Sequence, residues 1–247
     1  MAKSRTYQTR FYRGWINRQG LATFEVQVGE TDLQIRARCK LVDQARRLAT
    51  TARGDIESYA ARVPRFITSL SPLPIRDPCP PVVQAMLAAG QAYDVGPMAA
   101  VAGAIAEAVG RGLLSYSDEV IVENGGDIWL SLPRPAVLSV YCGVGSPFSH
   151  SLRLRVDGRG RPLGICTSSG TVGHSLSFGR ADAVVAVAED AALADAAATA
   201  ICNRIQKPED IQPVLEAEQK RGLLLGMVAV MGKYLAAWGA VELNTAD

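Results

Sequence analysis

The sequence predicts an α+β fold in which mixed, mainly antiparallel sheets pack against helices. Short alternating or apolar runs separated by glycine-containing turns occur in several parts of the chain and are typical of hairpins. Longer stretches between them carry apolar residues at helical spacing. Because the two kinds of segment follow no regular strand–helix–strand order, the pattern favours antiparallel sheets over a parallel β/α winding.

The first elements are expected to be strands followed by one helix. Residues 7–16 predict a strand, and residues 23–28 and 33–38 alternate between apolar and polar side chains. This alternation predicts two half-buried strands joined by a turn at residues 29–32. Apolar residues then recur every three or four positions over residues 43–63, which predicts a helix that ends before a proline.

Proline and small residues mark the next part of the chain. Residues 72–81 hold a run of prolines, so we expect an internal seam there within a single domain that spans residues 1–247. Two helical stretches follow, at residues 82–92 and 98–109, and the second is rich in alanine and glycine. Small residues let a backbone approach a sheet, another helix or a ligand closely.

The second half of the chain predicts strands and then helices. Strands are expected over residues 119–156, with hairpin turns at residues 124–127 and 157–160. A further strand (residues 183–188), a helix (191–205) with Asp190 as its N-cap, and a second helix (208–221) follow. Residues 222–243 are apolar but divided by glycines, which favours a buried hairpin over a membrane span.

Composition excludes several classes of protein. The 247 residues carry a net charge of +2, and the five cysteines never form a Cys-x-x-Cys pair, which argues against a disulfide framework or a zinc motif. Two histidines are too few for a histidine-rich metal centre. Aromatic residues are not interleaved with the arginines, so we expect no nucleic-acid partner. Residues 1–20 lack the apolar segment of an export signal, and we expect a cytoplasmic protein.

Asp195 and Thr199 are the first candidate site. They lie four residues apart in an alanine-rich helix, so their side chains share one face. A carboxylate and a hydroxyl on a bare face suit Mg²⁺, which takes few protein ligands and completes its shell with water and phosphate oxygens. The alternative is an alanine helix with two polar residues facing water, and spacing alone favours that alternative.

Two glycine-containing segments are further candidates. Residues 124–127 predict either an ordinary hairpin turn or a bare backbone that a ring or phosphate can approach. Residues 167–170 offer clustered hydroxyls and amides that can line a phosphate site, or form an ordinary loop. His174 follows, as a hydrogen-bonded structural residue or as a catalyst.

The order of three motifs carries a resemblance to a known family. Asn-Gly-Gly-Asp (residues 124–127), Thr-Ser-Ser-Gly (167–170) and Ala-Asp-Ala-x-Ala-Thr-Ala (194–200) resemble the FAD:protein FMN transferase (ApbE) superfamily. Residues 94–99 are similar to that family's Asp-x-Gly-x-x-Ala segment, and residues 96–103 look like an uncharacterised cytoplasmic branch of ApbE-like proteins. The resemblance implies an ApbE-like fold.

The resemblance also implies roles for individual residues. Asp195, Thr199 and a backbone carbonyl near Ala99 would bind Mg²⁺, and Asp195 and His174 would be catalytic. The residues implied to line the FAD pocket are Met98, Asn124, Gly125, Gly126, Asp127, Thr167, Ser168, Ser169 and Gly170. The implied reaction is Mg²⁺-dependent transfer of FMN from FAD to a hydroxyl of an acceptor protein. With water as acceptor it becomes cleavage of the FAD pyrophosphate.

The chain departs from the family pattern at two places. Ala100 and Val101 stand where the transferases usually carry lysine and glycine, and the His-x-x-Asp-Pro-x-Thr-Gly motif is not continued after His174. The alternatives are therefore a flavin- or nucleotide-binding protein without turnover, or an accessory protein in anaerobic sulfur or amino-acid metabolism. The sequence leaves a homo-oligomer open.

Overall fold

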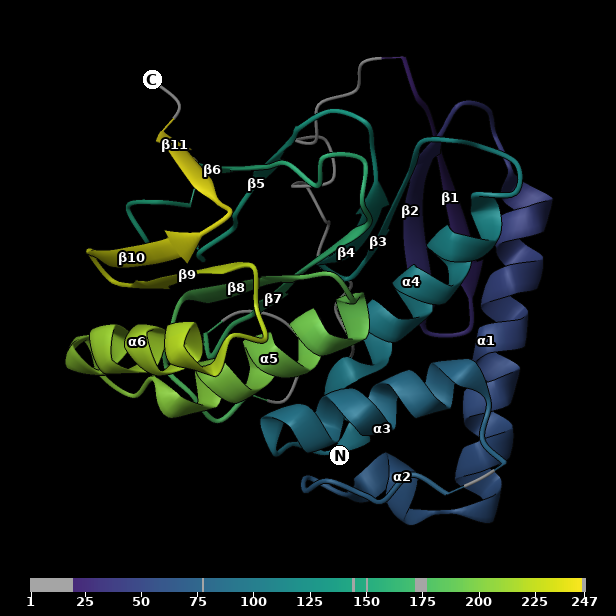
Figure 1. The fold of residues 1–247 in the computed structure, drawn as a ribbon, viewed down its shortest axis with the longest axis horizontal. Coiled ribbons are helices and arrows are strands. Elements are labelled where there is room, and N and C mark those ends of the chain that lie inside the picture. Colours follow the sequence, from purple (N-terminus) through teal and green to yellow (C-terminus); the bar gives the residue numbers. More distant parts are fainter. Residues whose placement is uncertain (1–19, 77, 144, 150, 172–176, 246–247) are drawn as a thin grey trace.

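The fold consists of two antiparallel sheets and a layer of helices (Figure 1). The computed structural model describes residues 20–76, 78–143, 145–149, 151–171 and 177–245. The strands are β1 (Ala22–Val28), β2 (Thr31–Ala37), β3 (Val120–Asn124), β4 (Asp127–Ser131), β5 (Ala136–Ser139), β6 (Leu152–Val156), β7 (Leu163–Ser168), β8 (Ala183–Ala188), β9 (Gly226–Met231), β10 (Tyr234–Gly239) and β11 (Glu242–Thr245). The helices are α1 (Val42–Arg62), α2 (Arg65–Thr68), α3 (Pro81–Tyr93), α4 (Val101–Leu113), α5 (Ala191–Arg204) and α6 (Ile211–Arg221), with 3₁₀ turns η2 (Pro97–Ala100) and η3 (Pro208–Asp210).

The larger sheet has the strand order β1-β2-β3-β4-β7-β8-β9-β10, and the smaller has the order β11-β6-β5. Every strand pairing within the described ranges is antiparallel. The α+β prediction is confirmed. In the part of the chain that the structure describes, no helix has the length and apolar character of a bilayer span.

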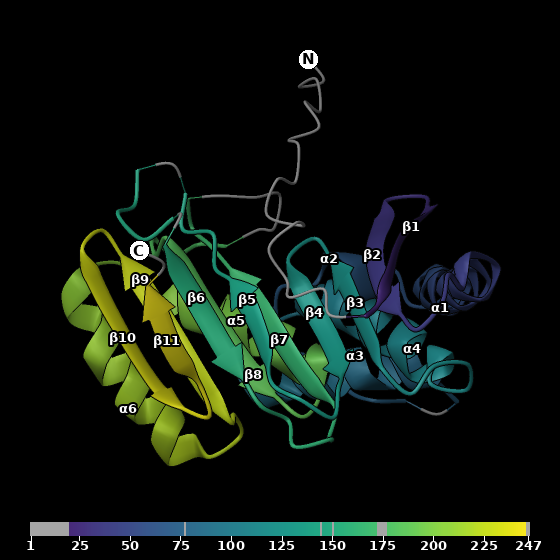
Figure 2. The ribbon, with the colours of Figure 1, turned by 90° about the horizontal axis from the view of Figure 1, so that it is seen from above.

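Two apolar cores hold the layers together. Helices α1, α4, α5 and α6 cover one face of the larger sheet, α3 packs against α1, α4 and α5, and all five contribute to the main core. The smaller sheet covers the opposite face, where Ile121, Leu154 and Val228 belong to a second core. Figure 2 shows β5 and β6 in front of the larger sheet, with α5 behind it. The strands in the middle of the larger sheet are therefore buried on both faces.

Helix α1 illustrates why these residues form these elements. Ala45, Ala49, Ala52, Ile56 and Tyr59 recur at helical spacing and are buried, while the opposite face of the helix is exposed. The helix ends at Arg62, and the next residues enter a short helical turn, α2. The predicted helix over residues 43–63 is confirmed.

The small residues of α4 permit the close packing that the sequence predicts. A Cβ at Gly110 would overlap the indole ring of Trp129 on β4. The same helix contacts β3, β4 and α5, so it lies beside α5 and over the strands that carry the 124–127 turn.

Several sequence predictions need correction. Strand β2 is buried along its whole length and not half-buried: on the face expected to be wet, Gln34 and Arg36 are buried, and Arg36 donates a 2.8 Å hydrogen bond to Gln34. Residues 157–160 do not form a hairpin turn: β6 belongs to the smaller sheet and β7 to the larger, so the turn carries the chain between sheets. Strand β10 is a partly exposed edge strand, although its hairpin with β9 is confirmed.

Candidate functional site

The candidate residues meet at one end of the larger sheet. The β3–β4 turn, the last residues of β7 and the first residues of β8 lie at the same end, because neighbouring strands run in opposite directions. The first turn of α4 reaches this end as well, since the Asn124 side-chain amide donates a 3.1 Å hydrogen bond to the carbonyl of Ala102. Segments far apart in the sequence are thereby brought together.

Asp195 is held at the crossing of α4 and α5. Its Oδ2 accepts a 2.9 Å hydrogen bond from the backbone N–H of Gly103, near the start of α4. Gly103 is required for this approach, because a Cβ there would overlap the carbonyl oxygen of Ala191 and lie 2.9 Å from the Cβ of Asp195. The N–H groups in the first turn of a helix lack intrahelical partners and favour a negative charge. The carboxylate therefore occupies a fixed position.

Asp127 is the second carboxylate of this region. Its Oδ1 accepts a 3.1 Å hydrogen bond from the backbone N–H of Thr167, which ties the start of β4 to β7. The side chain is buried, and it also contacts the buried thiol of Cys166. The thiol itself lies 3.3 Å from the carbonyl of Ala191 at the start of α5. Cys166 thus lies between the strand that carries Asp127 and the helix that carries Asp195.

The two carboxylates influence each other. Burial raises the pKa of Asp127 to about 7, and burial followed by the nearby charge of Asp127 raises the pKa of Asp195 well above its usual value. The hydrogen bond from Gly103 opposes the second shift but does not cancel it. A cation bound between two such carboxyl groups would favour their charged forms, because its positive charge offsets both negative charges. This charge balance fits a divalent metal ion.

Thr199 and the η2 turn complete the predicted metal ligands only in part. Asp195 and Thr199 are both partly exposed one turn apart on α5, and the residues between them are buried alanines. The η2 turn that contains Met98 and Ala99 packs against α5. No group of three or more His, Cys, Asp or Glu side chains among the described residues could enclose a metal ion. The donors present suit Mg²⁺, which keeps water and substrate oxygens in its shell.

The side chains of residues 167–170 do not form one continuous surface. Ile165 faces the smaller sheet and Cys166 faces the helices, so the pleat places the side chain of Thr167 on the sheet side and that of Ser168 on the helix side. Ser168 is buried beside Cys202, whereas Ser169 is partly exposed. The structure therefore brings Ser168 and the Thr167 amide to the helix side, but not the Thr167 hydroxyl.

The glycines of both motifs have structural roles. Gly125 and Gly126 have φ values of +70° and +106°, and the N–H of Gly126 donates a 2.8 Å hydrogen bond to Glu123, so the predicted β3–β4 turn is confirmed. Gly170 donates a 2.9 Å hydrogen bond to the carbonyl of Ala181. His174 lies outside the described residues.

Glu107 caps α5, a role that the sequence had assigned to Asp190. Asp190 stands at the N-cap position without a side-chain capping bond. Instead, Glu107 on α4 accepts a 2.7 Å hydrogen bond from the backbone N–H of Ala191, and Arg111 pairs with Glu107 at 2.7 Å. Burial raises the pKa of Glu107. The spacing of Glu107 and Arg111 on one helix was visible in the sequence, but their contact with α5 was not.

Comparisons with other proteins agree with this architecture. The family model described as AbpE bacteria matches residues 13–231. A UPF0280 protein from Methanococcus aeolicus is 36% identical over 223 residues, which cover 88% of this chain and 90% of the relative. A UPF0280 protein from Methanopyrus kandleri is 43% identical over 182 residues, which cover 73% of each chain.

Solved structures share the fold at low sequence identity. The apo flavinyl transferase ApbE of Pseudomonas stutzeri matches with a TM-score of 0.57 and 12% identity, covering 88% of this chain and 94% of the other. A variant of the flavin transferase ApbE of Vibrio cholerae matches with a TM-score of 0.57 and 15% identity, covering 89% and 97%. At this level of identity the likeness concerns the fold alone.

Proposed function

The chain belongs to the AbpE bacteria family and has the fold of the ApbE flavin transferases, and from this premise we propose that it is a Mg²⁺-dependent enzyme acting on FAD. The reaction is transfer of FMN to a hydroxyl of an acceptor protein, or cleavage of the FAD pyrophosphate when water takes the place of that hydroxyl. The observation that carries the proposal is that Asp195, held by the first turn of α4, lies close enough to Asp127 for the charge of Asp127 to raise its pKa.

Asp195 and Thr199 are assigned to the metal, together with a backbone carbonyl of η2 near Ala99. Two features support this assignment. Asp195 is held by Gly103 in one orientation, so little side-chain freedom is lost on binding a cation. The raised pKa of Asp195 reflects a negative charge that lacks full compensation in the protein alone.

The remaining residues of the region are assigned to the nucleotide. Asn124, Gly125 and Gly126 present a turn with little side-chain bulk, and Met98, Ser168, Ser169 and Gly170 flank it in the proposal. Asp127 holds the Thr167 amide in place, so the end of β7 keeps its position relative to the turn. These contacts would orient the dinucleotide and exclude water from its phosphates.

In the proposed reaction the acceptor hydroxyl forms a new bond to the phosphorus of the FMN half. The bond from that phosphorus to the bridging oxygen breaks, and AMP leaves with the bridging oxygen while the hydroxyl proton passes to solvent or a base. Bound Mg²⁺ would neutralise the charge that develops on the phosphate oxygens. The protein contributes mainly by fixing the reactants, as in other phosphoryl transfers.

The test is release of AMP from FAD. Purified protein is incubated with FAD and Mg²⁺, with and without an extract that supplies acceptor proteins, and AMP is measured by chromatography. The variant Asp195→Asn should lose AMP release, whereas Asp190→Asn, an exposed aspartate beside the same helix, should retain it. If FAD stays intact under all these conditions, the enzyme proposal fails.

A second candidate is binding of a flavin nucleotide without turnover. The sequence favours it at one place, because Ala100 and Val101 replace the lysine and glycine usual in the transferases. Thermal-shift titration separates the two candidates: a binding protein without turnover is stabilised by FAD and leaves it intact.

A further inference from the structure

A separate cavity of about 760 Å³ opens beyond β7 at the same end of the larger sheet. It lies among the start of β8, the β9–β10 turn, η3 and the chain that follows β5. None of the residues assigned above to the metal or to FAD lines it. Its volume is in the range of small-molecule sites, about 300–1,000 Å³.

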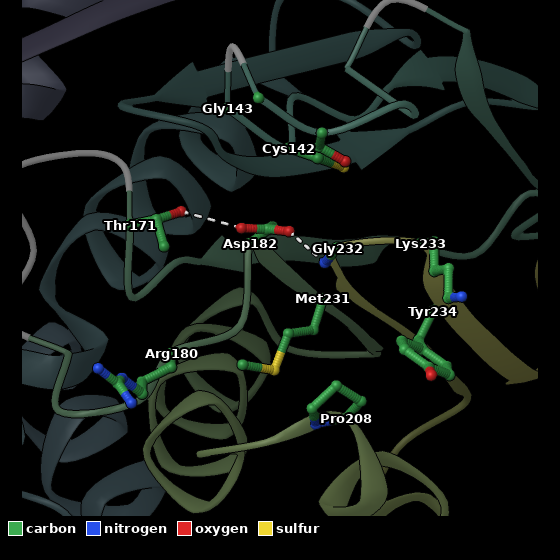
Figure 3. Close-up of a pocket in the computed structure, with 12 residues that line it drawn as sticks. Cys142, Gly143, Thr171, Arg180, Asp182, Pro208, Met231, Gly232, Lys233 and Tyr234 are labelled. Carbon is green, nitrogen blue, oxygen red and sulfur yellow. Dashed lines mark hydrogen bonds between the residues drawn. The ribbon is translucent and has the colours of Figure 1, made fainter.

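The framework of this cavity is fixed by hydrogen bonds. Asp182 accepts one bond from the Thr171 hydroxyl (3.4 Å) and another from the backbone N–H of Gly232 (2.6 Å), as the dashed lines in Figure 3 show. The backbone of Arg180 is held to the end of α5 by a 2.8 Å hydrogen bond to the carbonyl of Ile205. The residues that line the cavity and make these bonds therefore lie near the ends of strands and of α5, where the hydrogen bonds hold them in place.

The charge balance of the cavity favours an anion. Arg180 and Lys233 both line it and are exposed, and none of the ion pairs found among the described residues involves either side chain. Among the described residues that line the cavity, Asp182 is the only acid, and its two oxygens already accept the hydrogen bonds from Thr171 and Gly232. Arginine and lysine together commonly bind phosphate groups.

The surface between the two cations is apolar. Figure 3 shows Arg180 on one side and Lys233 with Tyr234 on the other, with Met231 and Pro208 between them. Tyr234 is 49% exposed although it is a large aromatic residue, so its ring is available to a ligand. Methionine, proline and tyrosine side chains form good contacts with a planar ring.

We propose that this cavity is a second binding site, independent of any metal, for a phosphate monoester that carries a planar ring, which is the chemistry of a nucleoside monophosphate. Arg180, on one side of the cavity, binds the phosphate, and Met231, Pro208 and Tyr234 contact the ring, with Lys233 beside the ring on the other side. The site goes beyond the proposed function, because it needs neither Asp195 nor Mg²⁺. AMP and FMN both have this chemistry, and a comparison of their affinities tells which ring the cavity prefers.

The experiment is calorimetric titration in the presence of EDTA with three probes: AMP, FMN and inorganic phosphate. The variants are Arg180→Gln, Lys233→Gln and Tyr234→Ala, and the matched control is Arg47→Gln, an exposed arginine on α1 at the other side of the molecule. Thermal unfolding of each variant confirms that it is folded.

At least one nucleotide should bind without metal, and inorganic phosphate should bind more weakly by at least about tenfold because it lacks the ring. Arg180→Gln should weaken nucleotide binding about tenfold, because a hydrogen bond to a charged group is lost, whereas Lys233→Gln, beside the ring, should weaken it less. Tyr234→Ala should weaken the nucleotides but not phosphate.

Absence of binding by both nucleotides would overturn the proposal, and so would equal losses in Arg47→Gln and Arg180→Gln. Binding that requires Mg²⁺ and disappears in Asp195→Asn would also overturn it, while supporting the proposed function. The two proposals can therefore fail separately.

Discussion

Replacement of Gly103 by alanine tests the crossing of α4 and α5 directly. The new Cβ would overlap the carbonyl oxygen of Ala191 and lie 2.9 Å from the Cβ of Asp195, so the two helices must move apart. The overlap involves backbone and cannot be relieved by a side-chain rotation. The same movement lengthens the 2.9 Å hydrogen bond from the Gly103 N–H to Asp195.

The magnitude follows from three contributions. Overpacking a close contact costs about 1–3 kcal/mol, and weakening a hydrogen bond to a carboxylate costs about 1.5–3 kcal/mol. Alanine gains about 1 kcal/mol over glycine inside a helix. The net loss of unfolding free energy is then about 1.5–5 kcal/mol, which corresponds to a fall in Tm of about 3–20 °C for a protein of this size.

The assay is thermal unfolding by circular dichroism, with Gly54→Ala as the control. Gly54 lies inside α1, and a Cβ there meets nothing within 4 Å. The control should therefore gain about 1 kcal/mol and unfold a few degrees higher. If both variants gain stability equally, α4 and α5 do not approach each other as described, and the fixed position of Asp195 is refuted.

Three further predictions concern the same region. Glu107→Ala should lower the free energy of unfolding by about 1–2 kcal/mol in a denaturant titration, because the Ala191 N–H at the start of α5 loses its acceptor. Asp127→Asn should flatten the pH dependence of stability measured in EDTA. The folded-state pKa of Asp127 is about 7 against about 4 when unfolded, so its contribution is greatest below pH 4 and is lost as the pH rises through 7, up to about 4 kcal/mol. Thr199→Val should weaken Mg²⁺ binding in the presence of FAD about tenfold without changing Tm, because only a hydroxyl ligand is removed.

Each of these has an outcome that contradicts it. Unchanged stability in Glu107→Ala would mean that water or Asp190 caps α5 equally well. If the free energy of unfolding of the wild type rises between pH 4 and 7 and Asp127→Asn removes that rise, burial does not raise the pKa of Asp127. Equal Mg²⁺ affinity in Thr199→Val and Thr199→Ser would remove the hydroxyl from the metal site.

Local patterns predicted the elements well, because they depend on neighbouring residues. The alternation over residues 23–28, the apolar run at residues 183–188 and the alanine-rich stretch at residues 191–205 correspond to β1, β8 and α5. Helical spacing also predicted that Asp195 and Thr199 lie one turn apart. The expected strand over residues 7–16 lies outside the described residues, and the seam at residues 72–81 stays a prediction.

Contacts between distant segments were not predictable in the same way. Strand β11 pairs with β6 in the smaller sheet, and the turn after β6, which resembles a hairpin, leads to β7 in the larger sheet. Asp190 is the N-cap residue of α5 as predicted, but the hydrogen bond to the Ala191 N–H comes from Glu107, because tertiary packing brings α4 to that helix. The alternation of β7 divided the hydroxyls of residues 167–169 between two faces, although they are consecutive in the sequence.

The central claim is that Asp195 and Thr199 hold a divalent cation against the phosphates of FAD. A crystal soaked with FAD and Mn²⁺, which replaces Mg²⁺ and scatters anomalously, tests it most directly. The account predicts an anomalous peak in contact with the Asp195 carboxylate and the Thr199 hydroxyl, with the pyrophosphate of FAD completing the shell of the ion. A nucleotide bound elsewhere, or a bound nucleotide with no anomalous peak beside Asp195, would contradict it.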